Sequence, residues 1–317
     1  MERDILTDLG RCPQSGAALH WTPEGHLASA AGHIYPVHNG VASFLHNLSG
    51  DQATAKKFYD EFGWAPDLQG DLQETKAFVD RRGLVAQHMR SCMRTLGERY
   101  FAGGGKYFLD AGCGPLVDEE VVALGKRFDR YICADISTRA LTMAREKLGD
   151  RGIYLASDIT NLPIADGMVD AIACNHVIYQ LPLDMQEAVF RELWRVLKPG
   201  GVAVVIFWWN DAQVAWRAER LAGLLGLRGP GEQPHEPLPE LPHNTRPRSW
   251  FEAIDWPFAY EYDIYSIVPQ LFMRKFIPDD WRGRAFLSGV RMFQALAPRY
   301  CGRHGRMPAI VFRKDRV

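Results

Sequence analysis

A glycine-rich turn at the end of an apolar run constrains the fold of this chain more than any other feature. The turn lies in residues 109–115 (LDAGCGP), and a second apolar run ends in Asp135, 21 positions beyond Gly114. Glycines in a strand-to-helix turn let a ligand lie against backbone N–H groups, and an acid at the next strand tip can accept hydrogen bonds from a ribose. The pairing predicts an α/β fold with a doubly wound sheet. The residues expected around the ligand at this turn are Asp110, Ala111, Gly112 and Gly114.

Details of the turn favour one class of ligand. A dinucleotide fingerprint would place its third glycine where this chain has Val117. A carboxylate at Asp110 would also repel a pyrophosphate, but it suits a ligand that carries an ammonium group. S-adenosylmethionine has an ammonium group, a ribose diol and no phosphate. We therefore expect it as the cofactor, with S-adenosylhomocysteine as the product.

Further apolar runs extend the predicted sheet and the predicted site. Residues 153–156 are typical of a third strand, which ends near an acid that can meet the adenine amino group. Residues 170–175 (DAIACN) predict a fourth strand and residues 202–208 a fifth. The additional residues expected beside the cofactor are Ile136, Ser137, Asp158, Ile159 and Asn175.

The motifs LDAGCGP, CADIS, SDITNLP, DGMVDAIACNHV and ELWRVLKPGG follow one another in order over residues 106–208. In order and spacing they resemble the class I S-adenosylmethionine-dependent methyltransferases, with a core like that of methyltransferase type 11. The family often has a third small residue after the second glycine, where this chain has Pro115 and Leu116. The resemblance implies a seven-stranded, Rossmann-like sheet in residues 106–317, a helical lid over residues 51–105, and methyl transfer.

Residues 1–50 predict a separate small β module, because short apolar runs alternate with turns. The segment resembles the zinc-ribbon-like family that includes the small activator subunit of tRNA methyltransferases. Metal-binding members carry paired cysteines, but Cys12 has no partner cysteine in this module. We therefore expect a degenerate, metal-free module and assign no metal ligand in the chain.

The C-terminal part predicts two strands, at residues 260–265 and 308–313, that form an antiparallel pair in this fold. The connection between them is longer than a hairpin needs, so we expect an inserted helical segment at about residues 268–306. From Gln270 to Val317 there are eleven Lys and Arg residues and three acids. This local charge of +8 is consistent with either a solvated helix face or a wall that binds an anionic substrate.

The segment after the fourth strand faces the methyl group in the family, and here it contains His176 and Tyr179. His176 is the first candidate for a catalytic base, because the ordinary pKa of histidine lies near neutrality, and Tyr179 is the second. A base is needed only if the acceptor must lose a proton to react. The Asn-Pro-Pro-aromatic motif of amino-nitrogen methylation is absent, since His176 and Val177 follow Asn175.

Composition narrows the possible binding partners and the cellular compartment of the protein. The net charge of −1 argues against bulk attraction to nucleic acid or a membrane, and no apolar run approaches the roughly 20 residues of a membrane span. Six scattered cysteines without a C-x-x-C pair are typical of reduced thiols in a cytoplasmic protein. We expect a monomer or homodimer.

The leading functional hypothesis is a methyltransferase for a small molecule, such as a secondary metabolite or a sugar derivative. One alternative is an rRNA or tRNA base methyltransferase, since some of these join a zinc-ribbon-like N-terminus to the same core. Another is a protein that binds the cofactor without transferring methyl, as a cyclase or a binding module.

Overall fold

The computed structural model describes residues 3–46, 48, 50–231 and 243–315. A nine-stranded sheet runs through the molecule in the order β11-β12-β10-β9-β6-β7-β8-β5-β4. Its strands are β4 (Val37–His38), β5 (Val41–Ser43), β6 (Gly105–Ala111), β7 (Phe128–Asp135), β8 (Gly152–Ala156), β9 (Val169–Asn175), β10 (Leu197–Ile206), β11 (Tyr260–Ser266) and β12 (Met307–Arg313).

Strands β6 to β10 are parallel, and β12 pairs antiparallel with both β10 and β11. Seven of the nine strands therefore form the predicted Rossmann-like sheet, and the predicted fold class is confirmed. These strands are almost continuously apolar because helices cover both faces, so successive side chains are buried on both sides. Parallel strands end at a common edge, which brings the ends of β6, β7, β8 and β9 together.

Crossover helices connect the parallel strands: α5 (Glu119–Gly125), α6 (Thr138–Leu148) and α7 (Gln186–Val196). Asp118 caps α5, since its carboxylate accepts hydrogen bonds from the backbone N–H groups of Glu120 (2.9 Å) and Val121 (3.4 Å). Two more helices, α8 (Gln213–Leu224) and α9 (Arg248–Glu252), follow β10.

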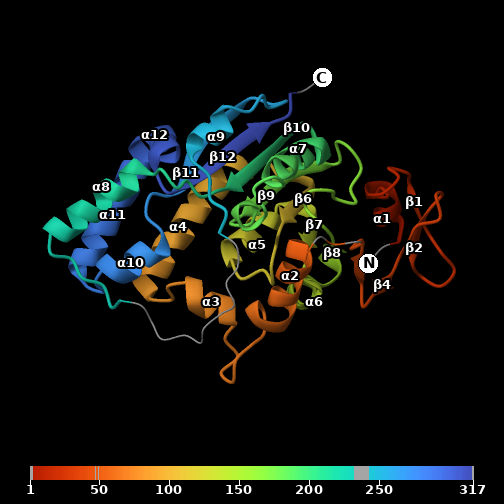
Figure 1. Cartoon of the computed structure of the whole chain (residues 1–317), viewed down its shortest axis with the longest axis horizontal. Helices are drawn as coiled ribbons and strands as arrows, with labels where there is room; N and C mark the ends of the chain where they lie inside the picture. Colours follow the sequence, from red (N-terminus) through yellow and green to blue (C-terminus); the bar gives the residue numbers. More distant parts are fainter. Residues whose placement is uncertain (1–2, 47, 49, 232–242, 316–317) are drawn as a thin grey trace.

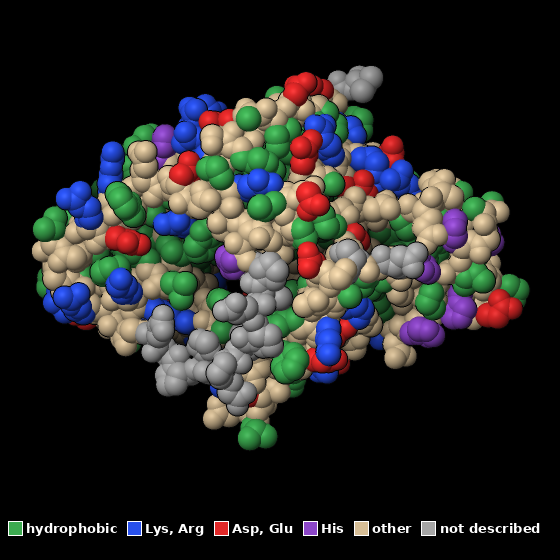
Figure 2. Space-filling view, in the orientation of Figure 1, with side chains coloured by type: hydrophobic (Ala, Val, Ile, Leu, Met, Phe, Trp, Pro, Cys, Tyr) green, Lys and Arg blue, Asp and Glu red, His purple; other side chains and the backbone are tan. Residues whose placement is uncertain are grey.

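The first fifty residues contain a small β-sheet, as we expected, and two further strands that join the large sheet. Helix α1 (Arg3–Leu9) precedes a three-stranded antiparallel sheet of β1 (Leu19–Trp21), β2 (Leu27–Ser29) and β3 (Ile34–Tyr35). Strands β4 and β5 instead join the large sheet, where β5 pairs in parallel with β8. Figure 1 places the small sheet at one end of the molecule, and Figure 2 shows histidine side chains gathered there.

Helices fill residues 50–100: α2 (Gly50–Phe58), the π-helical turn η1 (Tyr59–Gly63), α3 (Gln73–Phe78) and α4 (Gly83–Tyr100). Helix α4 has an apolar side that packs into the core beside the sheet. The connection from β11 to β12 holds three helices, α10 (Gln270–Phe276), α11 (Trp281–Leu296) and α12 (Pro298–His304). They lie at the end of the molecule opposite the small sheet (Figure 1).

Candidate active site

The glycine turn has the backbone conformation that the sequence suggests. Gly112 and Gly114 have φ values of 76° and 53°, a region that favours glycine. A Cβ atom at Gly112 would lie 2.3 Å from Cγ2 of Val177. The segment after β9 therefore packs directly against the turn, and a larger residue at position 112 would separate the two.

Asp135, the predicted ribose ligand, fastens the turn to the end of β7. Its carboxylate accepts hydrogen bonds from the backbone N–H groups of Gly114 and Ser137, both at 2.8 Å. Burial raises the pKa of Asp135 to about 6, although these backbone bonds lower it. Ser137 also caps α6 and donates a hydrogen bond of 2.7 Å to Asp60 in the π-helical turn η1.

Asp110 is buried at the end of β6, directly before Ala111. The Tyr131 hydroxyl donates to its carboxylate at 2.7 Å, and burial raises the pKa of Asp110 to about 7, with smaller contributions from Asp118 and Asp135. Within the described part of the chain no Lys or Arg bonds to Asp110 or Asp135. Buried carboxyls without a cationic partner suit a ligand that brings positive charge, so these residues fit S-adenosylmethionine.

The residues expected at the adenine lie beyond β8. Asp158 accepts a hydrogen bond from the backbone N–H of Thr160 at 2.8 Å and another from the Gln52 side chain of α2. Ile159 is buried, while Ile136 is partly exposed. Helix α2 and the π-helical turn η1 thus lie across the strand ends where we expect the cofactor. The cofactor roles of these residues stay predictions.

His176 follows Asn175 at the end of β9 and has an unusual backbone conformation, with a φ value of 61°. Its ring lies 5.3 Å from that of Tyr265 and 6.2 Å from that of Tyr179, centroid to centroid. The His243 ring lies 5.0 Å from the Tyr179 ring, centroid to centroid. The structure therefore brings the two catalytic candidates together with two aromatic residues from distant segments.

His176 keeps partial solvent exposure, yet burial, with a smaller effect of His243, lowers the pKa of its imidazole to about 4. Protein thus surrounds this side chain, but part of it stays exposed. We call the surroundings of His176 the central recess. The His176 ring is therefore neutral near pH 7. Burial also raises the pKa of the Tyr179 hydroxyl.

Glu74 on α3 belongs to the same recess, and sequence analysis did not identify it. Its side chain is partly exposed, but burial raises the pKa of its carboxyl to about 7. Its charge contributes to the raised pKa values of Tyr59 and Tyr179. Helix α3 packs against η1, where the Tyr59 hydroxyl donates a hydrogen bond of 2.6 Å to the side chain of Gln180, the neighbour of Tyr179. No other described residue forms a hydrogen bond or ion pair with this carboxyl. The central recess therefore comprises Glu74, His176, Tyr179, His243 and Tyr265.

Arg274 of α10 fixes the position of α3. This buried guanidinium donates hydrogen bonds to the backbone carbonyls of Ala77 (2.6 Å), Val79 (2.8 Å) and Lys76 (3.1 Å). It satisfies carbonyl groups that the end of a helix leaves without partners.

Other arginines of the insertion also have partners within the protein. Three of them form ion pairs: Arg282 with Asp280, Arg299 with Glu261, and Arg303 with Glu252. The predicted wall for an anionic substrate thus gains no support from these residues.

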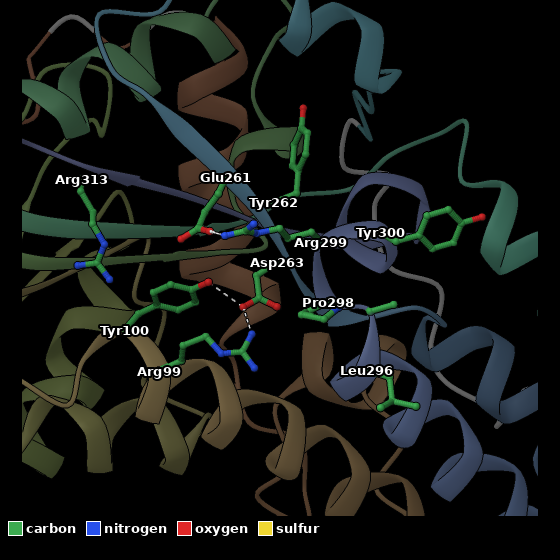
Figure 3. A pocket seen from close by; sticks show the side chains of 11 residues that line it. Arg99, Tyr100, Glu261, Tyr262, Asp263, Leu296, Pro298, Arg299, Tyr300 and Arg313 are labelled. Atoms are coloured by element: carbon green, nitrogen blue, oxygen red, sulfur yellow. Dashed lines mark hydrogen bonds and ion pairs between the residues drawn. The ribbon is translucent and has the colours of Figure 1, made fainter.

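A surface pocket of about 580 Å³ lies away from the expected site, beside the edge strand β11. Figure 3 shows its floor, where the Tyr100 hydroxyl donates to Asp263 at 2.7 Å and Arg99 forms an ion pair with the same carboxylate. None of the predicted site residues lines it. Its central charges neutralise one another, so it is not our candidate.

The N-terminal part holds one notable thiol. Cys12 is buried with the Tyr35 hydroxyl at 2.9 Å and Nδ1 of His33 at 3.4 Å from its Sγ atom. Burial acts to raise the pKa of Cys12, but hydrogen bonds with Ser15, Tyr35 and Ser29 lower it to about 6. Among the residues that the structure describes, no three His, Cys, Asp or Glu side chains gather as metal ligands. The zinc-ribbon-like and metal-free character of this part stays a prediction.

Comparisons with known proteins agree with the motifs. Residues 109–205 match the family model described as methyltransferase domain. A malonyl-[acyl-carrier protein] O-methyltransferase from Pectobacterium atrosepticum is 37% identical over 115 residues, covering 34% of this chain and 43% of that protein. A ubiquinone/menaquinone biosynthesis C-methyltransferase from Yersinia pestis is 33% identical over 103 residues, covering 31% of this chain and 40% of that protein. The matches thus span less than half the length of these relatives.

A solved structure gives the same fold. It is that of phosphoethanolamine N-methyltransferase 1 from Haemonchus contortus, in complex with phosphoethanolamine and S-adenosylhomocysteine. It aligns with a TM-score of 0.51 and 12% identity over 84% of this chain and 50% of that one, so the likeness concerns the fold alone. The family implies S-adenosylmethionine as the cofactor. From motifs, sheet order and family model together, the chain contains a class I S-adenosylmethionine-dependent methyltransferase domain.

Proposed function

We propose that this chain transfers a methyl group from S-adenosylmethionine to a small molecule bound in the central recess. The observation that carries the proposal is the packing of Val177, between His176 and Tyr179, directly against Gly112 of the glycine turn. The carboxyl of Glu74 on α3, whose pKa burial raises to about 7, adds a group that can accept a proton. The cofactor supplies a methyl group that its sulfonium has already activated. The protein must hold the acceptor atom in line with it and exclude water.

The cofactor would lie across the strand ends. Asp135 would accept hydrogen bonds from the ribose, and Asp158 would meet the adenine amino group. Asp110 would face the positive charge of the ligand, which would lower the raised pKa of its carboxyl. Gln52 already donates to Asp158, so α2 would adjust where the adenine binds.

Glu74 is better suited than His176 to accept a proton near pH 7. A base works best when its pKa lies near the operating pH, and the pKa of Glu74 is about 7 whereas that of His176 is about 4. As the bond between acceptor and methyl carbon forms and the carbon–sulfur bond breaks, the acceptor proton would pass to Glu74. His176 and Tyr179 would then orient the acceptor through hydrogen bonds.

The lining of the recess favours a neutral or cationic acceptor with an ionisable N–H, O–H or C–H group. Its members include a carboxyl, two imidazoles and two phenols, and none of these is cationic near neutrality. An anionic acceptor would meet the charge of Glu74 without compensation. The N-terminal part and the basic insertion keep an RNA-base methyltransferase as the alternative.

The test combines release of S-adenosylhomocysteine with variants of the recess. Amines, phenols and carbon acids are offered in turn, and with an active acceptor Glu74→Gln should lower turnover by about 10²–10⁴-fold. Glu61→Gln, at an exposed position of the π-helical turn η1, is the matched control and should leave turnover unchanged. Calorimetry should show unchanged affinity for S-adenosylhomocysteine in both variants.

The pH dependence separates a base from a merely structural residue. Turnover of the wild type should rise with pH through about 7, as Glu74 loses its proton, and Glu74→Gln should lose this acidic limb. Full turnover in Glu74→Gln would remove this residue from catalysis and return the role to His176. Cofactor binding without release of S-adenosylhomocysteine for any acceptor would favour a cyclase or binding module, and tight, salt-dependent RNA binding would favour the RNA alternative.

A further inference from the structure

Helix α11 exposes large apolar side chains to solvent, together with arginines. Three large apolar side chains are strongly exposed: Trp281 at 75%, Met292 at 64% and Leu296 at 77%. Leu287 and Gly283 on the opposite side are buried. A helix at the surface of a globular protein normally has polar residues on its outer side. The outer side of α11 therefore lacks the partner that its composition suits.

Helix α8 repeats the pattern. Its exposed side includes Trp216 at 66%, Leu221 at 50% and Leu224 at 85%. Both α8 and α11 pack against α12, so the two helices lie at the same end of the molecule (Figure 1). We call the exposed side chains of α8 and α11 the outer face.

The charges of the outer face have one predominant sign. Helix α11 contains three arginines and no acid, and α8 contains Arg217 and Arg220 with a single acid, Glu219. Within the described residues, Arg217 and Arg284 form no ion pair. Figure 2 shows Lys and Arg side chains interspersed with hydrophobic ones at this end of the molecule.

We propose that the outer face rests on the surface of an anionic lipid bilayer. Exposed tryptophans beside aliphatic side chains suit the boundary between headgroups and acyl chains, and arginines among them suit lipid phosphates. No helix in the described part of the chain is long and apolar enough to span a membrane, so the contact is peripheral.

The overall charge of −1, from which we expected no attraction to membranes, conceals this arrangement. The segment from Gln270 to Val317 carries +8 and the rest of the chain about −9. Three arginines of this segment belong to α11, which has no acid. A peripheral protein is attracted through the charge of the face that it presents, since salt screens charges farther away than about 10 Å.

A second copy of the chain is a poorer occupant. In a two-fold symmetric dimer the same surface would contact itself, and its arginines would face arginines with Glu219 as the single acid of the two helices. An anionic bilayer supplies the opposite charge together with an apolar layer. This proposal does not depend on the proposed methyl transfer, because the outer face shares no residue with the central recess.

The experiment is sedimentation of the full chain with vesicles of phosphatidylcholine alone or mixed with phosphatidylglycerol. The wild type should bind the mixed vesicles far better, and added salt should weaken that binding. Replacing both tryptophans (Trp216→Ser with Trp281→Ser) should lower binding by about tenfold or more. Arg217→Gln with Arg284→Gln should lower it by about 25-fold, since each basic residue near the surface contributes about fivefold.

Leu68→Ser is the matched control, because Leu68 is fully exposed but does not belong to the outer face. This variant should leave vesicle binding unchanged. Calorimetry with S-adenosylhomocysteine checks that each variant is folded. Equal binding of the wild type to both kinds of vesicle, or unchanged binding of the tryptophan variant, overturns the proposal. Self-association that the tryptophan variant abolishes, without vesicle binding, would assign the outer face to a second copy and overturn it as well.

Discussion

The two halves of the candidate active site are built in different ways. The cofactor half, which comprises the glycine turn, Asp135 and Asp158, lies at the ends of three adjacent parallel strands. Backbone N–H groups of the turn and of the residues after β7 hold Asp135 in place. The central recess instead consists of side chains from α3, from the segment after β9 and from β11, together with His243. A chain can thus carry a recognisable cofactor site while its acceptor site depends on segments with no common motif.

The difference extends to what supports each half. The cofactor half needs only the sheet and its turns. The recess needs α3, whose last carbonyls are bonded to a guanidinium almost two hundred positions later in the chain. Damage to the cofactor half should therefore affect binding of any ligand that contains adenosine, whereas damage to the support of the recess should affect the acceptor first.

The largest effect is expected from Asp135→Ala. If this residue binds the ribose, the variant loses two hydrogen bonds to a charged acceptor and should bind S-adenosylhomocysteine about 10²–10⁴-fold more weakly. It also releases the N–H groups of Gly114 and Ser137. Calorimetry measures the affinity, and Asp129→Ala, at the exposed start of β7, is the control. Unchanged affinity would contradict the ribose assignment.

A smaller effect, on the central recess, is expected from Arg274→Met. The variant leaves three backbone carbonyls without a donor and should lower the free energy of unfolding by about 3–5 kcal/mol. In the folded fraction, KM for the acceptor should rise while affinity for S-adenosylhomocysteine stays near that of the wild type. Lys275→Met, at an exposed neighbouring position, should change neither quantity. Equal losses at both sites would show that the two halves are not independent.

The smallest effect is expected from Asp110→Asn, and it concerns how the stability of the protein depends on pH. Burial raises the pKa of Asp110 to about 7 from an ordinary value of 3.8, so the folded state holds its proton more tightly than the unfolded state. This group therefore contributes stability that is present at low pH and is lost as pH rises from about 4 to about 7. The variant should stabilise the ligand-free protein by about 1–2 kcal/mol at pH 8 and less at pH 5. Thermal unfolding of the wild type and the variant at pH 8 and pH 5 measures this gain in stability. A larger gain at pH 5 than at pH 8 would contradict the prediction.

Local patterns accounted for most of the fold. Apolar runs with intervening turns predicted the seven strands of the methyltransferase sheet, because each buried parallel strand is a continuous apolar segment. Strands β4 and β5 were not predicted as part of the large sheet, because two or three residues are too few to show a period. Their place in the large sheet depends on pairing with β8, more than a hundred positions away.

The candidate site divides in the same way. The glycine turn and Asp135 could be predicted because their spacing along the chain reflects a single strand-turn-helix-strand unit. Glu74 could not, since the sequence around it (QETKAF) is polar and shows no apolar period. Burial raises the pKa of Glu74, and the position of α3 in the folded protein depends on Arg274, far away in the sequence.

The two outermost strands of the large sheet bear on how the protein avoids aggregation. One outermost strand, β4, is only two residues long, which is a poor template for a strand of another chain. Along the other, β11, the backbone of α12 lies so close that a Cβ atom at Gly302 would be 2.1 Å from the carbonyl oxygen of Asp263. Among the described strands, one margin is thus very short and the other is partly covered by α12, and both features disfavour strand addition between copies.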